Sequence, residues 1–455
     1  MPKLHAINID FTAPQGEIKP LHGVNDCPVS LDSPPKGFAE AGIPYCRLHD
    51  TAGAFGGARY VDIPNVFPDF DADPADPASY DFAFTDALLK QIHAAGTEPF
   101  YRLGVTIENN WRIKAYHIFP PKDFAKWAEI CAGIVRHYNE GWADGMHLGI
   151  TYWEIWNEPE NPPMWQGTRE EYFELYRVTA RRLKREFPSI KVGGYASCGF
   201  YAVTRPGMSD FFQSFLAWYD AFLDYVCASE TTAPLDFFSW HLYTDDPEEI
   251  ALHAKYVQDR LSAHGLTQTE NIFNEWNYAS GEEDQRWVNM KEADGAAFVA
   301  SAFCLMQESP IDKAMYYVAT PSGCYCGLYY FPSMDLTPTY YAFRAWRELH
   351  RLGSQCPIGG ELPPKCYVTA ATDGTDAAVL LVNNGDDTQE ISLHTTGPAL
   401  SHARLTDWTR KFATVPLQPT FQLPPKGVLL LTSRPIQDAE PEIQPRRTIH
   451  AGLDG

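Results

Sequence analysis

Two glutamates stand where strand-like segments end, a place where carboxyl groups can do acid–base or nucleophilic chemistry. Residues 152–159 read YWEIWNEP, a run of β-branched and aromatic residues that stops at Glu158. Pro159 has no N–H to donate to a neighbouring strand, so it ends the ladder. Because side chains alternate along a strand, Glu154, Trp156 and Glu158 are expected on one side of it. We expect Glu154 to lie deeper, as a buried acid with its hydrogen bonds satisfied.

The second glutamate ends a similar segment, residues 271–276, which read NIFNEW and contain Glu275. Cleavage of a glycosidic bond needs two carboxyl groups, and a separation of about 5–5.5 Å gives retention through a covalent intermediate. One of the two must have a raised pKa while the other is ionised. The pair therefore indicates glycosidic cleavage, if the fold brings both residues to one place.

The strands and helices that would bring the two glutamates together alternate along the chain as repeated βα units. Strand-like segments are 21–25, 45–49, 98–103, 151–157, 191–195, 237–243, 271–276 and 314–318. The helical segments between or after them are 82–95, 121–139, 169–187, 210–227, 247–264, 293–307 and 340–352, with a shorter first crossover at 33–41. Eight units predict an α/β fold, the (β/α)8 TIM barrel, whose active sites lie at the carboxyl ends of the strands. A doubly wound open sheet competes, but the glycine-rich loop expected after its first strand is missing.

A domain boundary is expected near residue 353, where the alternation of strands and helices gives way to strands alone. Short alternating strands separated by Asp-Gly, Asn-Gly and Pro-Pro turns fill 353–435 and predict an accessory β-sandwich. The alternating segment 1–16 is expected to join that sandwich, which leaves 17–352 for the barrel. The tail 436–455 is polar and contains prolines, a composition typical of disorder unless a neighbouring subunit of a homo-oligomer holds it.

Composition limits the partners and the compartment. A net charge of −22 argues against nucleic acid and against an anionic membrane surface. No stretch reaches the roughly 18 apolar residues of a membrane helix, and the first residues lack a signal-peptide pattern, so we expect a cytoplasmic protein. The ten cysteines are then expected to be reduced, with a bridge between Cys356 and Cys366 left open. No cofactor or metal is expected.

Both glutamate motifs resemble those of the clan A glycoside hydrolases: WNEP at 156–159 and NEWN at 274–277. Within the clan the chain looks like a member of glycoside hydrolase family 39, the β-xylosidase and α-L-iduronidase family. RLHD at 47–50 and WHLY at 240–243 extend the similarity. The resemblance implies a barrel with a sandwich built from both termini, and a retaining, cofactor-free exo-glycosidase acting on a small carbohydrate, most simply a β-D-xyloside.

Roles for individual residues follow from the resemblance. Glu158 would be the general acid/base and Glu275 the nucleophile. Asn157 would hydrogen-bond the sugar 2-hydroxyl, and Tyr243 would orient the nucleophile. Other candidates for contact with substrate are His49, His241, Tyr317 and Trp276.

The eighth strand departs from the family, because residues 315–326 lack the Trp that commonly stands there. Tyr317 is the nearest substitute, so another terminal sugar (arabinose, galactose or a uronic acid) stays open. So does a sugar-binding barrel without activity. Arg47 is expected to pair with a buried acid rather than to touch substrate.

Overall fold

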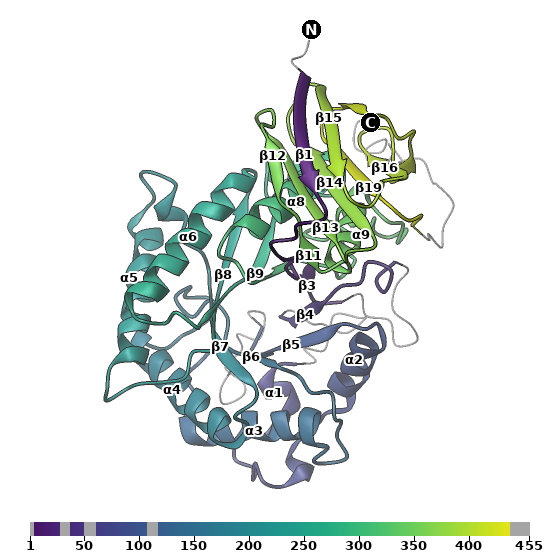
Figure 1. Ribbon diagram of the computed structural model, residues 1–455. Helices are drawn as coiled ribbons and strands as arrows, with labels where there is room; N and C mark the ends of the chain where they lie inside the picture. Colours follow the sequence, from purple (N-terminus) through teal and green to yellow (C-terminus); the bar gives the residue numbers. More distant parts are fainter. Residues whose placement is uncertain (1–3, 28–36, 50–60, 107–116, 437–455) are drawn as a thin grey trace, which may run out of the picture.

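The computed structural model describes residues 4–27, 37–49, 61–106 and 117–436 (Figure 1). Eight parallel strands close into a barrel in the order β10-β3-β4-β5-β6-β7-β8-β9, which confirms the predicted fold class. The barrel strands are β3 (Gly23–Asn25), β4 (Tyr45–Leu48), β5 (Glu98–Leu103), β6 (Tyr152–Ile155), β7 (Lys191–Ser197), β8 (Phe237–Thr244), β9 (Glu270–Tyr278) and β10 (Lys313–Tyr316). Each falls on a segment that the sequence predicts to be a strand.

Helices cover the outside of the barrel (Figure 1). They are α1 (Ile63–Val66), α2 (Ala83–Ala94), α3 (Phe124–Glu140), α4 (Arg169–Glu186), α5 (Asp210–Cys227), α6 (Pro247–Ala263), α7 (Glu283–Asn289), α8 (Ala293–Glu308) and α9 (Pro338–His350), with 3-10 turns η1 (Pro77–Ser79) and η2 (Tyr201–Val203). The start of α4 shows how the sequence sets the position at which a helix begins. Thr168 accepts a hydrogen bond from the backbone of Glu171, whose side chain bonds back to the Thr168 N–H, a capping box.

The barrel interior is layered. Its floor is a separate apolar cluster contributed by inward-facing residues, namely Tyr45, Phe100, Tyr152, Phe237, Ile272 and Met315. Two positions further along three of these strands, the inward side chains are Arg47, Arg102 and Glu154, all fully buried. Buried charges are tolerated when they are paired, and here Arg47 bonds Glu154 while Arg102 bonds Asp62, each at 2.7 Å. This charged layer supports the mouth of the barrel.

Two further sheets form the accessory β domain. A four-stranded sheet runs β12-β1-β15-β18 and a seven-stranded sheet runs β17-β16-β19-β14-β13-β11-β2. Their strands are β1 (Leu4–Asp10), β2 (Gly16–Glu17), β11 (Ser354–Gln355), β12 (Ile358–Gly360), β13 (Cys366–Thr372), β14 (Ala377–Asn383), β15 (Gln389–Thr396), β16 (His402–Thr406), β17 (Ala413–Thr414), β18 (Thr420–Leu423) and β19 (Gly427–Thr432). The N-terminal strand β1 pairs in parallel with β15, so both ends of the chain contribute to this domain.

The seven-stranded sheet is covered on both faces, which explains why β14 is buried along its whole length. Alternate residues of β14 join different cores. Leu380 and Val382 belong to the core shared with the barrel and its helices, whereas Val379 and Leu381 pack with Ile7 of the other sheet. In Figure 1, α8 and α9 lie between the barrel and this sheet. A strand buried on both faces reads as a continuous apolar run rather than an alternating one.

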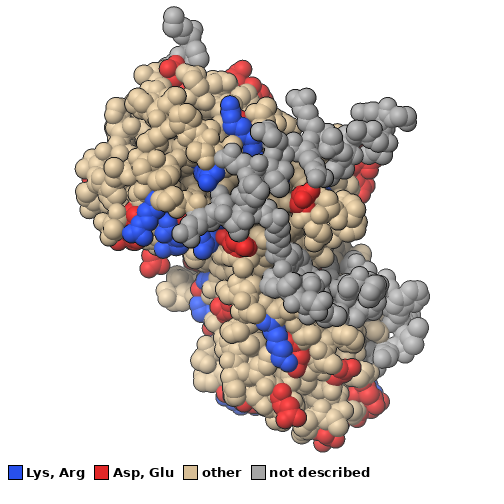
Figure 2. All heavy atoms as spheres, turned by 90° about the vertical axis from the view of Figure 1, so that its right-hand side faces the viewer, with Lys and Arg blue, Asp and Glu red and all other residues tan. Residues whose placement is uncertain are grey.

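Some predictions need qualification. The first crossover is made of turns at 37–42, and its earlier part lies outside the described residues, as do Asp50 and nearly all of the tail. The proposed division into domains stays a prediction. Cys356 and Cys366 are both free thiols. Among the helices of the described ranges, none has both the length and the apolar character needed to cross a membrane. On the face drawn in Figure 2, acidic and basic side chains of the described part are intermixed.

Candidate active site

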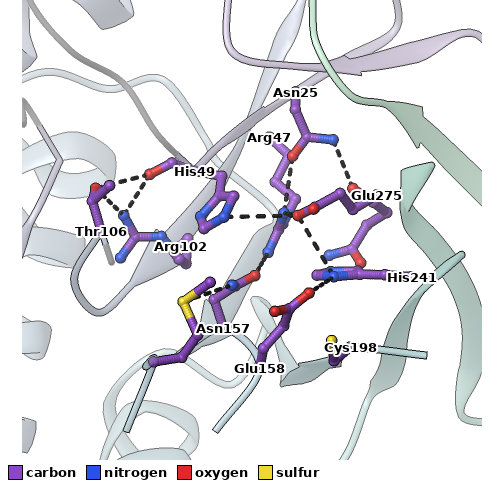
Figure 3. Close-up of polar contacts among 12 residues, drawn as sticks. Asn25, Arg47, His49, Arg102, Thr106, Asn157, Glu158, Cys198, His241 and Glu275 are labelled. Carbon is purple, nitrogen blue, oxygen red and sulfur yellow. Dashed lines mark hydrogen bonds and ion pairs between the residues drawn. The ribbon is translucent and has the colours of Figure 1, made fainter. Parts of the chain in front are cut away.

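The two glutamates singled out by their motifs meet at the carboxyl ends of the barrel strands. Glu158 follows β6 and Glu275 lies within β9, and both side chains are nearly buried, with 7% and 6% of each residue exposed. One carboxylate oxygen of each, together with a ring nitrogen of His241, lie within 4.8 Å of one another. Figure 3 shows the three groups converging. The fold therefore brings together residues that are more than a hundred positions apart.

The approach to Glu158 differs from the prediction. Strand β6 ends at Ile155, and both Trp156 (φ 74°) and Glu158 (φ 45°) have left-handed backbone conformations. Such conformations are costly for residues other than glycine and gather at functional sites. They break the alternation, so Trp156 faces Trp127 and Trp165 outside the barrel instead of sharing a side with Glu154. The expectation that Trp156 points inward was wrong because the strand stops earlier than the apolar pattern.

Glu275 is surrounded by donors that favour its ionised form. The Tyr243 hydroxyl donates to Oε1 at 2.9 Å, and Arg47 Nη1 donates to Oε2 at 3.1 Å. Nε2 of His49 lies 3.7 Å from Oε2. Burial raises the pKa of Glu275, and the neighbouring charge of Glu158 adds to this, while Arg47 and Tyr243 act in the opposite direction. Two donors are thus fixed on this carboxylate before any ligand arrives.

Glu158 has a different set of partners. Nδ1 of His241 lies 2.7 Å from Oε1, and the Asn161 amide donates to Oε2 at 3.2 Å. Burial raises the pKa of Glu158, opposed by weaker contributions that include Asn161 and Arg47. Burial also lowers the pKa of His241 to about 4, so this imidazole is neutral near pH 7. Glu158 therefore lacks a direct cationic partner, unlike Glu275, and retains a proton more readily than an ordinary glutamate.

Arg47 connects the residues of the site, and its guanidinium is fully buried. Besides Glu275, it donates from Nε to Glu154 at 2.7 Å and from Nη2 to Asn157 Oδ1 at 2.7 Å. The prediction that Arg47 pairs with a buried acid is confirmed. Glu154 also accepts hydrogen bonds from the Ser239 hydroxyl, at 2.6 Å, and from the Asn274 amide. Since Arg47 occupies the Asn157 oxygen, the orientation of that side-chain amide is set within the protein.

The remaining predicted contacts divide into two groups. Tyr317 lies near the mouth, with its ring centroid 6.2 Å from that of His49 and 6.4 Å from that of Tyr243. Trp276 does not reach the site: it is fully buried and packs against Phe273 and the residues of α8 and β10. Its prediction as a substrate contact was wrong, because the residue after Glu275 on β9 faces the surrounding helices.

Three residues close to Glu158 were not among the predicted site residues. Asn161 bonds the carboxylate directly, and Cys198, on the loop after β7, lies beside it (Figure 3). Glu160 accepts hydrogen bonds at 2.7 Å from the Ser197 hydroxyl and the Cys198 backbone, and burial raises its pKa to about 8. Glu160 and Asn161 directly follow the WNEP motif, so their place in the sequence could have indicated that they lie near Glu158. Nothing in the sequence around Cys198 indicates that it lies there.

Two of these carboxylates and a histidine are also residue types that can ligate a metal ion. In the described part of the chain, only Glu158, His241 and Glu275 gather as a group that could ligate a metal ion. Arg47 already places a positive charge 3.1 Å from Glu275. The arrangement suits general acid–base and nucleophilic chemistry carried by the side chains themselves.

Comparison with known proteins agrees with this geometry. Residues 62–280 match the model of the family "Glycosyl hydrolases family 39". A β-xylosidase of Geobacillus stearothermophilus is 28% identical over 218 residues, which is 45% of this chain and 40% of the relative. A β-xylosidase of Caldicellulosiruptor saccharolyticus is 26% identical over 37% of this chain and 32% of its own length. The matches thus span less than half of these relatives.

Solved structures resemble the chain over more of its length. A glucosidase from Croceicoccus marinus superposes with a TM-score of 0.73 at 22% identity, covering 94% of this chain and 99% of that one. A monomeric β-xylosidase from Caulobacter crescentus gives a TM-score of 0.67 at 17% identity, with the same coverage. At these identities the likeness concerns the fold.

Proposed function

Because the chain belongs to glycosyl hydrolases family 39, we propose that it is a retaining exo-glycosidase that hydrolyses terminal β-D-xylosides by double displacement. One observation carries the proposal. Two buried carboxylates have oxygens within 4.8 Å of one another, yet only Glu275 has a guanidinium and a phenol donating to it. Inverting enzymes hold their carboxyl groups about 6.5–9.5 Å apart to admit a water, so the short gap favours retention.

In the first step Glu275 attacks the anomeric carbon while Glu158 protonates the departing oxygen. The donors from Arg47 and Tyr243 favour the ionised form of Glu275 and orient it, and burial favours the protonated form of Glu158. In the second step Glu158, now ionised, takes a proton from water, and the resulting hydroxide displaces Glu275 from the sugar. His241 is placed to donate to the ionised Glu158 at 2.7 Å in this step.

Binding of the sugar would use the groups around the carboxylates. Asn157 is held by Arg47 through its oxygen, and its NH2 group, 3.9 Å from Met164 Sδ, would donate to the 2-hydroxyl. His49 lies on the side of the site away from Cys198 (Figure 3), where the terminal sugar would lie, and the Tyr317 ring is near His49. The two β-xylosidase relatives favour xylose. The absent Trp on the eighth strand leaves another terminal sugar as an outcome to be tested.

A panel of nitrophenyl glycosides tests this function. We expect the wild type to release nitrophenol fastest from the β-D-xyloside, and Glu275→Ala to lose activity by at least about 10³-fold, as removal of a nucleophile does. Azide should restore turnover of Glu275→Ala and give a glycosyl azide of inverted configuration. Glu140→Ala, which removes an exposed carboxylate of α3, is the control and should behave as wild type.

Three results would count against parts of the proposal. Preference for another glycone would replace xylose but keep the mechanism. Unchanged activity of Glu275→Ala would remove the assigned nucleophile. If the wild type binds sugars but cleaves no glycoside, the barrel is a sugar-binding protein.

A further inference from the structure

A third carboxyl group, that of Glu160, lies buried beside the acid of the site and takes no part in the double displacement. It follows Glu158 by two positions in the loop between β6 and α4, and only 7% of the residue is exposed. Oε1 accepts hydrogen bonds from the Ser197 hydroxyl and from the Cys198 backbone N–H, both at 2.7 Å. Oε2 is buried and has no hydrogen-bond partner among the described residues. The Glu160 side chain thus bonds the end of β7 and the residue after it.

This end of β7 is also in contact with Glu158. The Ala196 carbonyl accepts a hydrogen bond from the Glu158 N–H at 2.9 Å. The Cys198 side chain lies beside the Glu158 carboxyl group (Figure 3). The Asn161 amide, which donates to Glu158 Oε2 at 3.2 Å, is 3.9 Å from Cys198 Sγ. Residues 196–198 therefore form one wall of the space in which the Glu158 carboxyl group is oriented.

The backbone on both sides of this contact has an unfavourable conformation. Glu158 (φ 45°) and Ala196 (φ 57°) are both left-handed, and neither is a glycine. Such conformations cost free energy and persist only where the surrounding contacts fix them. The side chain of Glu160 reaches from the loop that contains Glu158 to the two residues that follow Ala196. It is therefore one of the contacts that can fix both segments.

Glu160 makes these contacts as a neutral acid near pH 7. Burial, and after it the charge of Glu158, raises the pKa of Glu160 to about 8. Its proton is therefore retained while Glu158 loses and regains one during the reaction. The Ser197 hydroxyl and the Cys198 N–H need only an acceptor, so an uncharged amide at position 160 should serve them as well.

We propose that Glu160 is a positioning residue for proton transfer: it ties the end of β7 to the loop that contains Glu158 and so orients the Glu158 carboxyl group toward the leaving oxygen. The inference rests on the proposed function and adds a residue to it. A general acid must lie within about 2.6–3.2 Å of the oxygen that it protonates, so a small displacement of Glu158 weakens the transfer. Glu275 is oriented separately, by Arg47 and Tyr243.

The dependence of rate on the leaving group separates a displaced acid from a damaged fold. A phenyl glycoside needs protonation of its leaving oxygen, whereas a dinitrophenyl glycoside of the same preferred sugar departs without it. The ratio of kcat/KM on phenyl to kcat/KM on dinitrophenyl glycoside therefore reports proton transfer from Glu158. In Glu160→Ala we expect this ratio to fall about tenfold or more, part of the 10²–10⁴-fold that general acid catalysis contributes. Glu160→Gln, which keeps the acceptor, should hold the ratio near that of the wild type.

A second variant keeps the test available if Glu160→Ala does not fold. Ser197→Ala removes one of the two donors and leaves Glu160 in place, so the ratio should fall in the same direction by about two- to fivefold, the effect of one neutral hydrogen bond. Glu98→Ala is the matched control. Its carboxylate accepts from the Thr151 N–H at 3.0 Å, a similar tie between neighbouring segments at the opposite end of the barrel strands. This variant should leave the ratio unchanged.

Three results would overturn the inference while leaving the glycosidase intact. One is an unchanged ratio in Glu160→Ala and Ser197→Ala. Another is an equal loss of kcat/KM on both substrates, which would mean a general effect on the fold. The third is a Glu160→Gln variant whose ratio is as low as that of Glu160→Ala. If the wild type cleaves neither glycoside, the proposed function fails together with the inference.

Discussion

At the scale of single residues, the two carboxylates differ in what donates to them. Arg47 and Tyr243 approach Glu275, whereas His241, neutral near pH 7, and Asn161 approach Glu158. Burial raises the pKa of both, and the charge of Glu158 also raises that of Glu275. The guanidinium and the phenol favour ionisation of Glu275, whereas the donors to Glu158 are uncharged.

Loss of the Tyr243 hydroxyl should show its role on Glu275. We expect Tyr243→Phe to lower kcat/KM on nitrophenyl glycosides by about 10–100-fold, since a hydrogen bond to a charged group contributes about 1.5–3 kcal/mol. The control is Tyr225→Phe, whose hydroxyl bonds Glu174 far from the mouth of the barrel. Equal kinetics for the two variants would rule out an orienting role.

The pH profile should report Glu158. Because its pKa lies above the ordinary glutamate value, the protonated acid persists to higher pH, and kcat/KM should fall as Glu158 loses its proton on the alkaline side. In Glu158→Gln this alkaline limb should vanish on activated aryl glycosides, while poor leaving groups suffer a far larger rate loss. Measurement of kcat/KM from pH 4 to 9 on both substrates checks this. An alkaline limb that persists in the variant would assign it to another group.

Sequence reasoning located Glu158 and Glu275 because a strand pattern that stops at a carboxylate is a local signal. It failed for Trp276, since neighbouring residues of β9 face different environments and only the register of the closed barrel decides which one points inward.

At the scale of elements, the loop between β6 and α4 contains a buried carboxyl group that affects stability. Glu160 is nearly inaccessible, and burial raises its pKa to about 8, helped by the charge of Glu158. An unfolded chain ionises this glutamate near its ordinary value, so the folded state is penalised as pH rises from about 4.5 and the penalty is complete above about 8. The loop is stable mainly when Glu160 is protonated.

Glu160→Gln should remove that penalty, because glutamine keeps an acceptor for Ser197 and Cys198 without the charge. At pH 8.5 we expect the variant to exceed the wild type in free energy of unfolding by about 4–5 kcal/mol, at about 1.4 kcal/mol per pKa unit. At pH 4.5 the two should be equal. Urea titrations at both pH values measure the difference. Equal stability at pH 8.5 would mean that Glu160 is not held protonated.

Long elements were predictable and short ones were not. All eight barrel strands and the long helices were predictable, because the strands are apolar runs buried along most of their length and each long helix buries an apolar face. Two-residue strands such as β2 and β11, and the short helix α7, form through pairing and packing with distant segments. The local sequence of a short element contains little information about such distant partners.

At the scale of the whole molecule, the seven-stranded sheet belongs to two cores at once. Leu380→Ala removes a fully buried side chain from the face toward the barrel helices, and Leu381→Ala does so on the face toward the smaller sheet. Each substitution should lower the free energy of unfolding by about 2–5 kcal/mol, the usual effect of such a cavity. We expect loss of glycosidase activity and loss of circular dichroism to coincide in urea for both variants. Activity that survives after the sheet unfolds would show that the barrel is independent.

The assignment of Glu275 as the nucleophile of a retaining reaction is the central claim, and trapping the covalent intermediate tests it most directly. A 2-deoxy-2-fluoro glycoside with a good leaving group and the preferred glycone should inactivate the wild type and add one fluorosugar mass. Peptide mapping should place that mass on Glu275, and proton NMR of normal turnover should show the product first in the anomeric configuration of the substrate. A label on another residue, or a product of inverted configuration, would contradict the account.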